Sequence, residues 1–302
     1  MCRAPRMFSH PGGMDIDYLD HTVVLNTDLD AAAERFAALG FLLSPPSAHR
    51  LSEQLNGPIA TYTCTANRCA VFGESFIELL GIVDENAPDP WHVKELAKSH
   101  PGLLLTFGTG DAELVERRWR AAGFPSTGVR SLERDVETAD GTRTVRARGV
   151  YLGAESTLGV GIQAGQHLTP QYIHQPRLLD HPNGAVGLHS VLLVVPDDAV
   201  DSFVERYSLI LATGSHVDGP KRVWSLRSGR FEIVGASALP EVLPGEHVPA
   251  LPCIAAQTVA VADLGLARKL IEDNGIVTRE MPAGFFVPAA AALGACVGFV
   301  AA

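Results

Sequence analysis

One pattern of apolar and polar positions occurs four times along the 302 residues. Each copy has a short apolar run, then an Asp, then a stretch whose apolar residues are spaced as on one face of a helix. Such a run is typical of a buried strand, and the spacing indicates an amphipathic helix. The apolar runs begin at His21, Leu103, His189 and Gln257, and the Asp residues after them are Asp28, Asp111, Asp197 and Asp263. Because repeats decide an architecture, this pattern is the main clue to the fold.

The residues that flank the first helical stretch predict where it begins and ends. Asp28 can accept hydrogen bonds from the free N–H groups of the first turn. Gly40 can adopt the left-handed conformation that ends many helices. We therefore expect a helix over residues 28–39. Strands are expected over residues 17–27, 59–64, 68–72 and 75–83. The first copy thus predicts a β-α-β-β-β module, and the later copies follow the same order.

Four such modules predict an α+β protein with two halves. The modules are expected at residues 17–83, 101–166, 185–236 and 253–302. Between the halves, residues 167–184 contain three prolines, which favour an extended linker. We therefore expect an N-terminal domain over residues 15–166 and a C-terminal domain over residues 185–302. Residues 1–14 are expected to be a loose extension.

Composition narrows the classes of partner. The net charge is −10, which argues against a nucleic acid or an anionic membrane, because both call for a basic patch. The apolar share of 46% allows a sizeable core. The five Cys lack CxxC spacing, so a disulfide framework is not expected and a cytoplasmic location fits. No stretch predicts a signal peptide or a transmembrane helix. A small molecule is therefore the expected partner.

Several phrases of the sequence resemble one known superfamily. They are Asp20-His21-Thr22-Val23-Val24, Leu39-Gly40-Phe41, Ala66-Asn67-Arg68, Phe76-Ile77-Glu78-Leu79-Leu80, Gln166-His167-Leu168-Thr169-Pro170 and His181-Pro182-Asn183-Gly184. These phrases and the four modules resemble the vicinal oxygen chelate superfamily, and in particular its glyoxalase-like branch. The superfamily includes glyoxalase I, extradiol dioxygenases and bleomycin resistance proteins. The resemblance implies two tandem domains, each a half-open barrel made from two modules.

The resemblance also implies a metal site, because metal ligands in the superfamily come from the first and last strands of the modules. Carried over, the ligands are His21, Glu78 and Gln163, while Leu104 stands where the second module would supply an imidazole. Weaker candidates are Gln166, His167, His189, Glu232 and Gln257. Imidazole and carboxylate suit divalent Fe, Mn, Zn, Ni or Co, so such an ion is the expected cofactor. A homodimer is a further expectation from the resemblance.

Glu78 and His21 also have structural interpretations. Strand alternation places Glu78 on the same side as Phe76 and Leu80, where a carboxylate needs a partner or a metal. If that side faces solvent, Glu78 has no special role. His21 could form a structural hydrogen bond with its neighbour Asp20.

Two classes of function follow from these residues. The His–Glu pairs favour a metal-dependent enzyme that acts on a small oxygenated metabolite, with isomerase, lyase and dioxygenase chemistry left open. The departure at Leu104 favours the alternative, a metal-free protein that binds a small molecule or sequesters an antibiotic. In a third version only the first half binds ligand. Candidate substrate-binding residues are Phe72, Phe76, Arg146 and Arg148.

Overall fold

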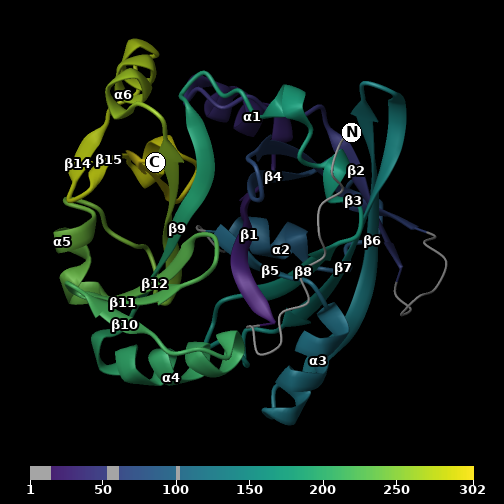
Figure 1. Ribbon diagram of the computed structural model, residues 1–302, viewed down its shortest axis with the longest axis horizontal. Coiled ribbons are helices and arrows are strands. Elements are labelled where there is room, and N and C mark those ends of the chain that lie inside the picture. The colour runs from purple at the N-terminus through teal and green to yellow at the C-terminus, as the bar shows by residue number, and fades with distance from the viewer. Residues whose placement is uncertain (1–14, 53–60, 100–102) are drawn as a thin grey trace, which may run out of the picture.

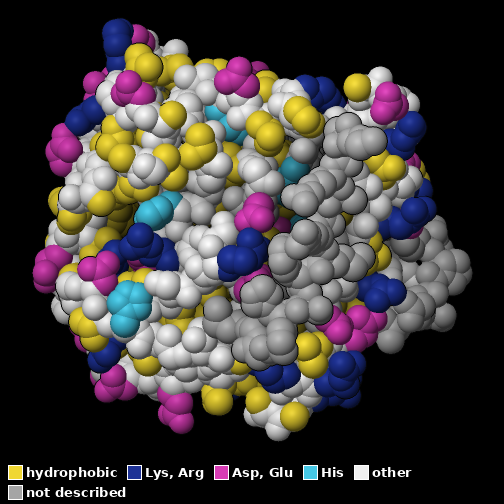
Figure 2. Space-filling model, in the orientation of Figure 1, with side chains coloured by type: hydrophobic (Ala, Val, Ile, Leu, Met, Phe, Trp, Pro, Cys, Tyr) yellow, Lys and Arg dark blue, Asp and Glu magenta, His cyan; other side chains and the backbone are white. Residues whose placement is uncertain are grey.

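The strands form two eight-stranded sheets, one from each half of the chain. The computed structural model describes residues 15–52, 61–99 and 103–302, so the expected extension over residues 1–14 lies outside the described residues. In Figure 1 the purple-to-teal first half lies beside the green-to-yellow second half. The predicted α+β fold with tandem halves is confirmed. On the face shown in Figure 2, Lys and Arg side chains are interspersed with Asp and Glu side chains.

The first sheet is a closed barrel with the strand order β1-β4-β3-β2-β6-β7-β8-β5. Its strands are β1 (Ile16–Asn26), β2 (Ser47–Ser52), β3 (Thr61–Val71), β4 (Phe76–Ile82), β5 (Leu103–Thr109), β6 (Ser126–Thr138), β7 (Gly141–Leu152) and β8 (Ile162–His167). Its helices are α1 (Leu29–Ala38), α2 (Val93–Ser99) and α3 (Ala112–Ala121). Antiparallel pairing of β1 with β5 joins the two modules, and antiparallel pairing of β2 with β6 closes the barrel.

The second sheet repeats this arrangement but stays open, with the order β10-β11-β12-β9-β13-β16-β15-β14. Its strands are β9 (Ala185–Val195), β10 (His216–Asp218), β11 (Lys221–Ser225), β12 (Arg230–Gly235), β13 (Cys253–Val261), β14 (Arg279–Met281), β15 (Gly284–Val287) and β16 (Cys296–Ala301). Its helices are α4 (Val200–Leu211), α5 (Leu239–Val242) and α6 (Leu264–Asp273). None of the helices in the described part of the chain has the length and apolar character that crossing a membrane requires.

The helix boundaries show what the recurring Asp does. Asp28, Asp111 and Asp263 each accept hydrogen bonds from backbone N–H groups of the helix that follows. Gly40 has φ +83°, as expected for the residue that ends α1. Asp197 differs, because its carboxylate accepts hydrogen bonds from the backbone and hydroxyl of Ser237 instead. The helix prediction is therefore confirmed at all four places, but the N-cap is present at three.

A single hydrophobic core joins the two halves. The fully buried Trp119 on α3 donates a hydrogen bond from Nε1 to the backbone oxygen of Ile210 on α4, at 3.0 Å. The backbone of Leu19 on β1 donates to Ser228 of the second half at 2.9 Å. Apolar side chains of both halves belong to one continuous cluster. The second half therefore completes the core of the first.

Residues 167–184 are not the extended linker that their prolines predicted. His167 ends strand β8, and two short 3-10 turns follow, at Pro170–Tyr172 and Pro176–Leu178. Ile173 and Leu178 pack against the barrel side chains Cys69, Val71, Phe76 and Val145. We call residues 168–184 the strap. It is compact because these apolar side chains are buried against the barrel.

His181 fixes the strap to the barrel, and its buried ring should make the free energy of unfolding depend on pH. Its Nδ1 accepts from the backbone N–H of Leu42 at 3.0 Å, and its Nε2 donates to the oxygen of Val71 at 2.9 Å. Burial lowers the pKa of His181 below 6.5, against the opposing effects of the Val71 carbonyl and Asp180. Above pH 6.5 the stabilisation provided by the neutral ring of His181 is fully present. It is lost as the pH falls towards the folded-state pKa, because the unfolded chain then binds more protons than the folded chain.

We expect the free energy of unfolding to fall by up to about 1.4 kcal/mol per pH unit below pH 6.5 on account of this one proton. Urea unfolding at pH 7.5 and pH 5.5 measures the effect, with His181→Gln as the comparison. Equal pH dependence in the two proteins would show that His181 does not cause it.

Candidate metal centre

The barrel encloses a cavity of about 580 Å³ with a predominantly apolar wall. A band of polar side chains crosses this wall, and five neighbouring strands contribute one residue each. In the strand order β1-β4-β3-β2-β6, they are His21, Glu78, Asn67, His49 and Arg134. A closed barrel turns alternate side chains of every strand inwards, so these five residues face the same space.

His21 is held with one ring nitrogen available to the cavity. Its Nδ1 lies 3.0 Å from Oδ2 of Asp20, and its ring stacks on Phe76 with the centroids 4.3 Å apart. Because a carboxylate only accepts hydrogen bonds, we assign the proton to Nδ1. Nε2 then carries a lone pair, and it lies 3.4 Å from Oε2 of Glu78.

Glu78 is a buried carboxylate that stays ionised. Asn67 donates from Nδ2 to Oε1 at 2.6 Å, and Nε2 of His49 lies 3.4 Å from the same oxygen. Burial alone would raise the pKa of Glu78. The hydrogen bond and charge of His49, the charge of His21 and the amide of Asn67 together lower it to about 2. The cavity therefore contains an ionised carboxylate next to the imidazole of His21.

Asp20 supports this arrangement from behind. It occupies a β-bulge of β1 between Leu19 and His21, and its side chain is fully buried. Its carboxylate accepts from His21 and also from Nε2 of His167, at 2.8 Å. Burial works against ionisation, yet His167 and His21 hold the pKa of the Asp20 carboxyl well below its usual range. A carboxylate bonded to the far nitrogen of a histidine is a common support for a metal ligand.

The donor atoms fit a divalent transition ion. Two atoms with lone pairs, Nε2 of His21 and Oε2 of Glu78, face each other at 3.4 Å, an arrangement that is favourable only with a cation or a proton between them. One nitrogen and one oxygen donor suit Fe, Mn, Co, Ni or Zn. Within the described residues, Asp20, His21 and His167 also lie close enough to share an ion. We favour the site between His21 and Glu78, because the Asp20 carboxylate already accepts hydrogen bonds from the imidazoles of His21 and His167.

The second module supplies weaker donors at the equivalent positions. Val23 pairs with Glu78, and Thr106 pairs with Gln163. Val23 and Thr106 each lie five residues before the Asp that caps the next helix. Gln163 therefore matches Glu78, and Leu104 matches His21; both line the cavity. Oε1 of Gln163 accepts from Oγ1 of Thr106 at 3.2 Å. The module thus offers an amide oxygen and an apolar side chain where the first offers a carboxylate and an imidazole.

Some other predicted residues lie away from the cavity wall. Gln166 bonds the backbone of Gly110 and Ala112 at the start of α3. Arg146 is exposed and pairs with Glu133 at 2.8 Å. Phe72 packs in the shared core.

Besides His21, Glu78 and Gln163, three other predicted residues line the cavity. Phe76 and His167 form part of its wall. Arg148 lines it too, while its guanidinium pairs with Glu113 at 2.6 Å. Nδ1 of His167 is buried and has no hydrogen-bond partner in the described structure.

The candidates of the second half are not brought together as a site. Glu232 matches Glu78 in register, but its carboxylate pairs with Nζ of Lys221 at 3.0 Å. The residue that matches His21 is Ser190, because His189 lies in a bulge one position earlier. Gln257 is also one position away and hydrogen-bonds Thr22 between the two sheets.

Part of the apolar face of the second sheet is covered by side chains. Leu239 and Leu243, from α5 and the residue after it, pack on that face. They contact a cluster that contains Leu192, Val194 and Val234. The site described above therefore belongs to the first half.

His49 and Arg134 were not predicted from the sequence as site residues. Both lie on the strands that close the barrel, β2 and β6, and neither strand was predicted as such. His49 alternates with Leu51, which was the available signal for an inward-facing position. Asn67 lies within one of the phrases that suggested the superfamily.

Comparisons with known proteins agree with this architecture. The profile of a glyoxalase-like domain family matches residues 19–210. A hypothetical protein from Staphylococcus aureus has a TM-score of 0.61 and 13% identity, with 95% of this chain and 100% of that chain covered. 4-Hydroxymandelate synthase from Streptomyces coelicolor, as a mutant, has a TM-score of 0.53 and 12% identity, with 89% and 78% covered.

A third similar structure is a xylose isomerase-like TIM barrel/4-hydroxyphenylpyruvate dioxygenase fusion protein. It has a TM-score of 0.54 and 14% identity, with 93% of this chain and 42% of that chain covered. At such identities the likeness concerns the fold. No protein of curated function matches the sequence.

Proposed function

Because the chain belongs to the glyoxalase-like domain family, we propose that it is a divalent-metal-dependent enzyme that acts on a small oxygenated molecule inside the first barrel. The observation that carries the proposal is the pair of facing donor atoms, Nε2 of His21 and Oε2 of Glu78, in the wall of a predominantly apolar cavity. Solved structures of the same fold that bear dioxygenase and synthase names are consistent with an enzyme. The reaction stays open among isomerisation, elimination and oxygenation.

Each residue of the centre has a definable task. His21 and Glu78 would hold the ion, with Gln163 as a neutral third ligand. Asp20 keeps the His21 ring in one tautomer and orientation. When bound, the ion would polarise a substrate oxygen as a Lewis acid. The predominantly apolar wall lowers the local dielectric constant and so strengthens electrostatic interactions inside the cavity.

The substitution Leu104→His tests the assignment of equivalent positions. It places an imidazole where the register matches His21, so it should add a third strong ligand. We expect the affinity for Co²⁺ to rise roughly tenfold or more. Leu132→His, which adds an imidazole elsewhere on the cavity wall, is the matched control. Equal gains in the two variants would contradict the assignment.

Leu104 also supports a second candidate function. With an apolar side chain and an amide at the second module's positions, the cavity suits a metal-free protein that binds or sequesters a small molecule. Trp91 and Phe76 in the wall would then supply contact area. This candidate predicts ligand binding that chelators leave unchanged, whereas the enzyme requires the ion.

Titration of the chelator-treated protein with Co²⁺ separates the two candidates. We expect one equivalent of Co²⁺ per chain, with an absorption spectrum that indicates nitrogen and oxygen ligands. A protein that binds no Co²⁺ and keeps its small-molecule ligand in EDTA would establish the second candidate instead.

A further inference from the structure

Arg134 is a buried cation without a counter-charge. Only 8% of the residue is exposed, and it lines the cavity from β6. Throughout residues 15–52, 61–99 and 103–302, its guanidinium makes no hydrogen bond or ion pair. Arginine is rarely buried without a partner, because an unpaired charge loses its hydration. The protein has a surplus of carboxylates, so the missing partner is unusual for this chain.

Two arginines near Arg134 are engaged, whereas Arg130, which lines the same cavity, has no hydrogen-bond or ion-pair partner among the described residues. Arg50 pairs with Asp135 at 2.7 Å, and Arg146 pairs with Glu133 at 2.8 Å. The nearby thiol of Cys69 cannot neutralise Arg134, because burial raises its pKa to about 12 and keeps it uncharged. The charge of Arg134 is therefore available to a molecule that enters the cavity.

Arg134 lies at one end of the polar band that begins at the candidate metal centre. It pairs directly with His49 across β2 and β6, and Nε2 of His49 lies 3.4 Å from Glu78. Arg130 is four residues earlier on the same strand and also lines the cavity. One molecule lying along the band would meet the donor atoms of His21 and Glu78 at one end and a guanidinium at the other.

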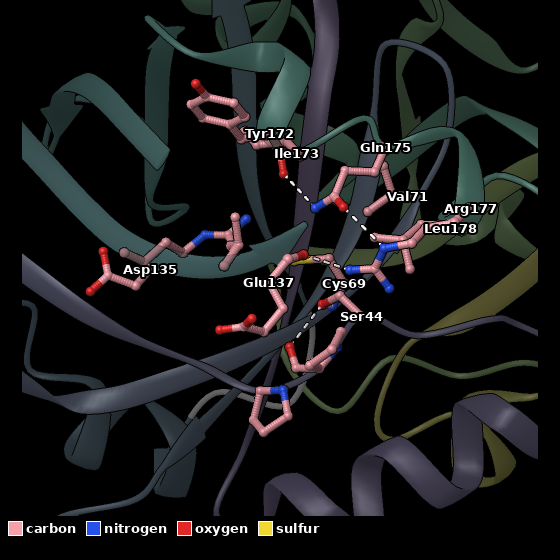
Figure 3. A pocket seen from close by; sticks show the side chains of 14 residues that line it. Ser44, Cys69, Val71, Asp135, Glu137, Tyr172, Ile173, Gln175, Arg177 and Leu178 are labelled. Atoms are coloured by element: carbon pink, nitrogen blue, oxygen red, sulfur yellow. Dashed lines mark hydrogen bonds between the residues drawn. The ribbon is translucent and has the colours of Figure 1, made fainter. Parts of the chain in front are cut away.

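Arg134 also lines a second, smaller pocket, from which an anion could in principle approach it. This pocket of about 60 Å³ lies against the strap, and Arg134 and Ile173 line both it and the cavity. Figure 3 shows Arg177 within it, reaching Gln175 and the backbone of Glu137. The pocket is too small for a metabolite, and its other guanidinium, that of Arg177, already makes hydrogen bonds. The large cavity is therefore the route to Arg134.

We propose that the substrate is an organic acid whose carboxylate is bound by Arg134, with an apolar body that fills the cavity towards His21 and Glu78. A guanidinium presents parallel N–H donors that match a carboxylate. A carboxylate carries a single negative charge, which suits the single positive charge of Arg134. The proposal rests on the proposed function for the role of the His21 end, but carboxylate binding itself needs no metal.

The test compares acids with their neutral amides in the presence of EDTA. Isothermal titration calorimetry of the wild-type protein uses two pairs of probes: 3-phenylpropanoate with 3-phenylpropanamide, and octanoate with octanamide. We expect at least one acid to bind about tenfold or more tightly than its amide, as for a charge-assisted hydrogen bond. Arg134→Met should reduce the affinity for that acid to the level of the amide and leave the amide unchanged.

Matched variants keep the test decisive. Arg143→Met removes the same charge from β7 outside the cavity, and we expect wild-type affinities. Arg134→Lys retains the charge and should keep part of the preference if Arg134→Met fails to fold. Phenyl phosphate binding more tightly than every acid would overturn the carboxylate assignment. So would acids that bind no better than amides, or not at all, in the wild-type protein.

Because EDTA is present throughout, the outcome is independent of the metal. A protein that prefers acids but binds no Co²⁺ would retain this inference and lose the metal-dependent function. A protein that binds Co²⁺ without a preference for acids would do the reverse.

Discussion

Replacement of His21 by alanine is expected to lower the affinity for Co²⁺ roughly hundredfold or more. Loss of a supporting residue alone typically costs ten- to a hundredfold, and His21 is placed as a direct ligand. Glu78→Gln should have a similar effect, since it removes the charge that His49 and Asn67 keep ionised. Competition with a chelating dye measures the affinity of each variant.

Two controls separate ligation from general damage. His216→Ala removes an exposed imidazole on β10 and should bind Co²⁺ as the wild type does. Asp20→Asn should reduce the affinity by about ten- to a hundredfold, because it weakens the support of the His21 ring without removing a ligand. Unchanged affinity in both His21→Ala and Glu78→Gln would rule out this centre.

The second large effect concerns stability. Trp119→Ala is expected to lower the free energy of unfolding by about 4 kcal/mol, through a cavity in the core and the lost hydrogen bond to Ile210. Trp119→Phe should cost less, because it keeps most of the packing. Leu114→Ala, on the exposed face of the same helix, should change the free energy by less than about 0.5 kcal/mol.

Guanidinium chloride unfolding, followed by circular dichroism, gives these free energies. A single transition that shifts as a whole in Trp119→Ala would agree with one core shared by both halves. A shift confined to one of two separate transitions would show that the halves unfold independently.

Local signals predicted the parts of the fold that local chemistry determines. The cap at Asp28 and the helices after Asp28 and Asp263 depend on residues a few positions apart, so the sequence alone locates them. Glu78 was predicted from the family resemblance, and its otherwise apolar strand supported the prediction. Closure of the barrel was not predictable in this way. β2 has the polar sequence Ser47–Ser52, and it becomes a strand by pairing with β3 and with β6, the latter some eighty residues later.

Register was the other limit. His189 occupies a β-bulge at the position that Asp20 has in β1, so it is one position away from the place of His21. One position moves a side chain to the other face of a sheet. Gln257 is also one position away, and it becomes a contact between the halves. Arg134 was missed for a different reason, because an absent partner is a property of three-dimensional surroundings.

We expect one divalent ion to bind between His21 and Glu78. Anomalous diffraction from a crystal grown with Co²⁺, recorded at the cobalt absorption edge, tests it most directly. We predict one strong peak within bonding distance of Nε2 of His21 and a carboxylate oxygen of Glu78. A peak between Asp20 and His167, or no peak inside the barrel, would contradict the account.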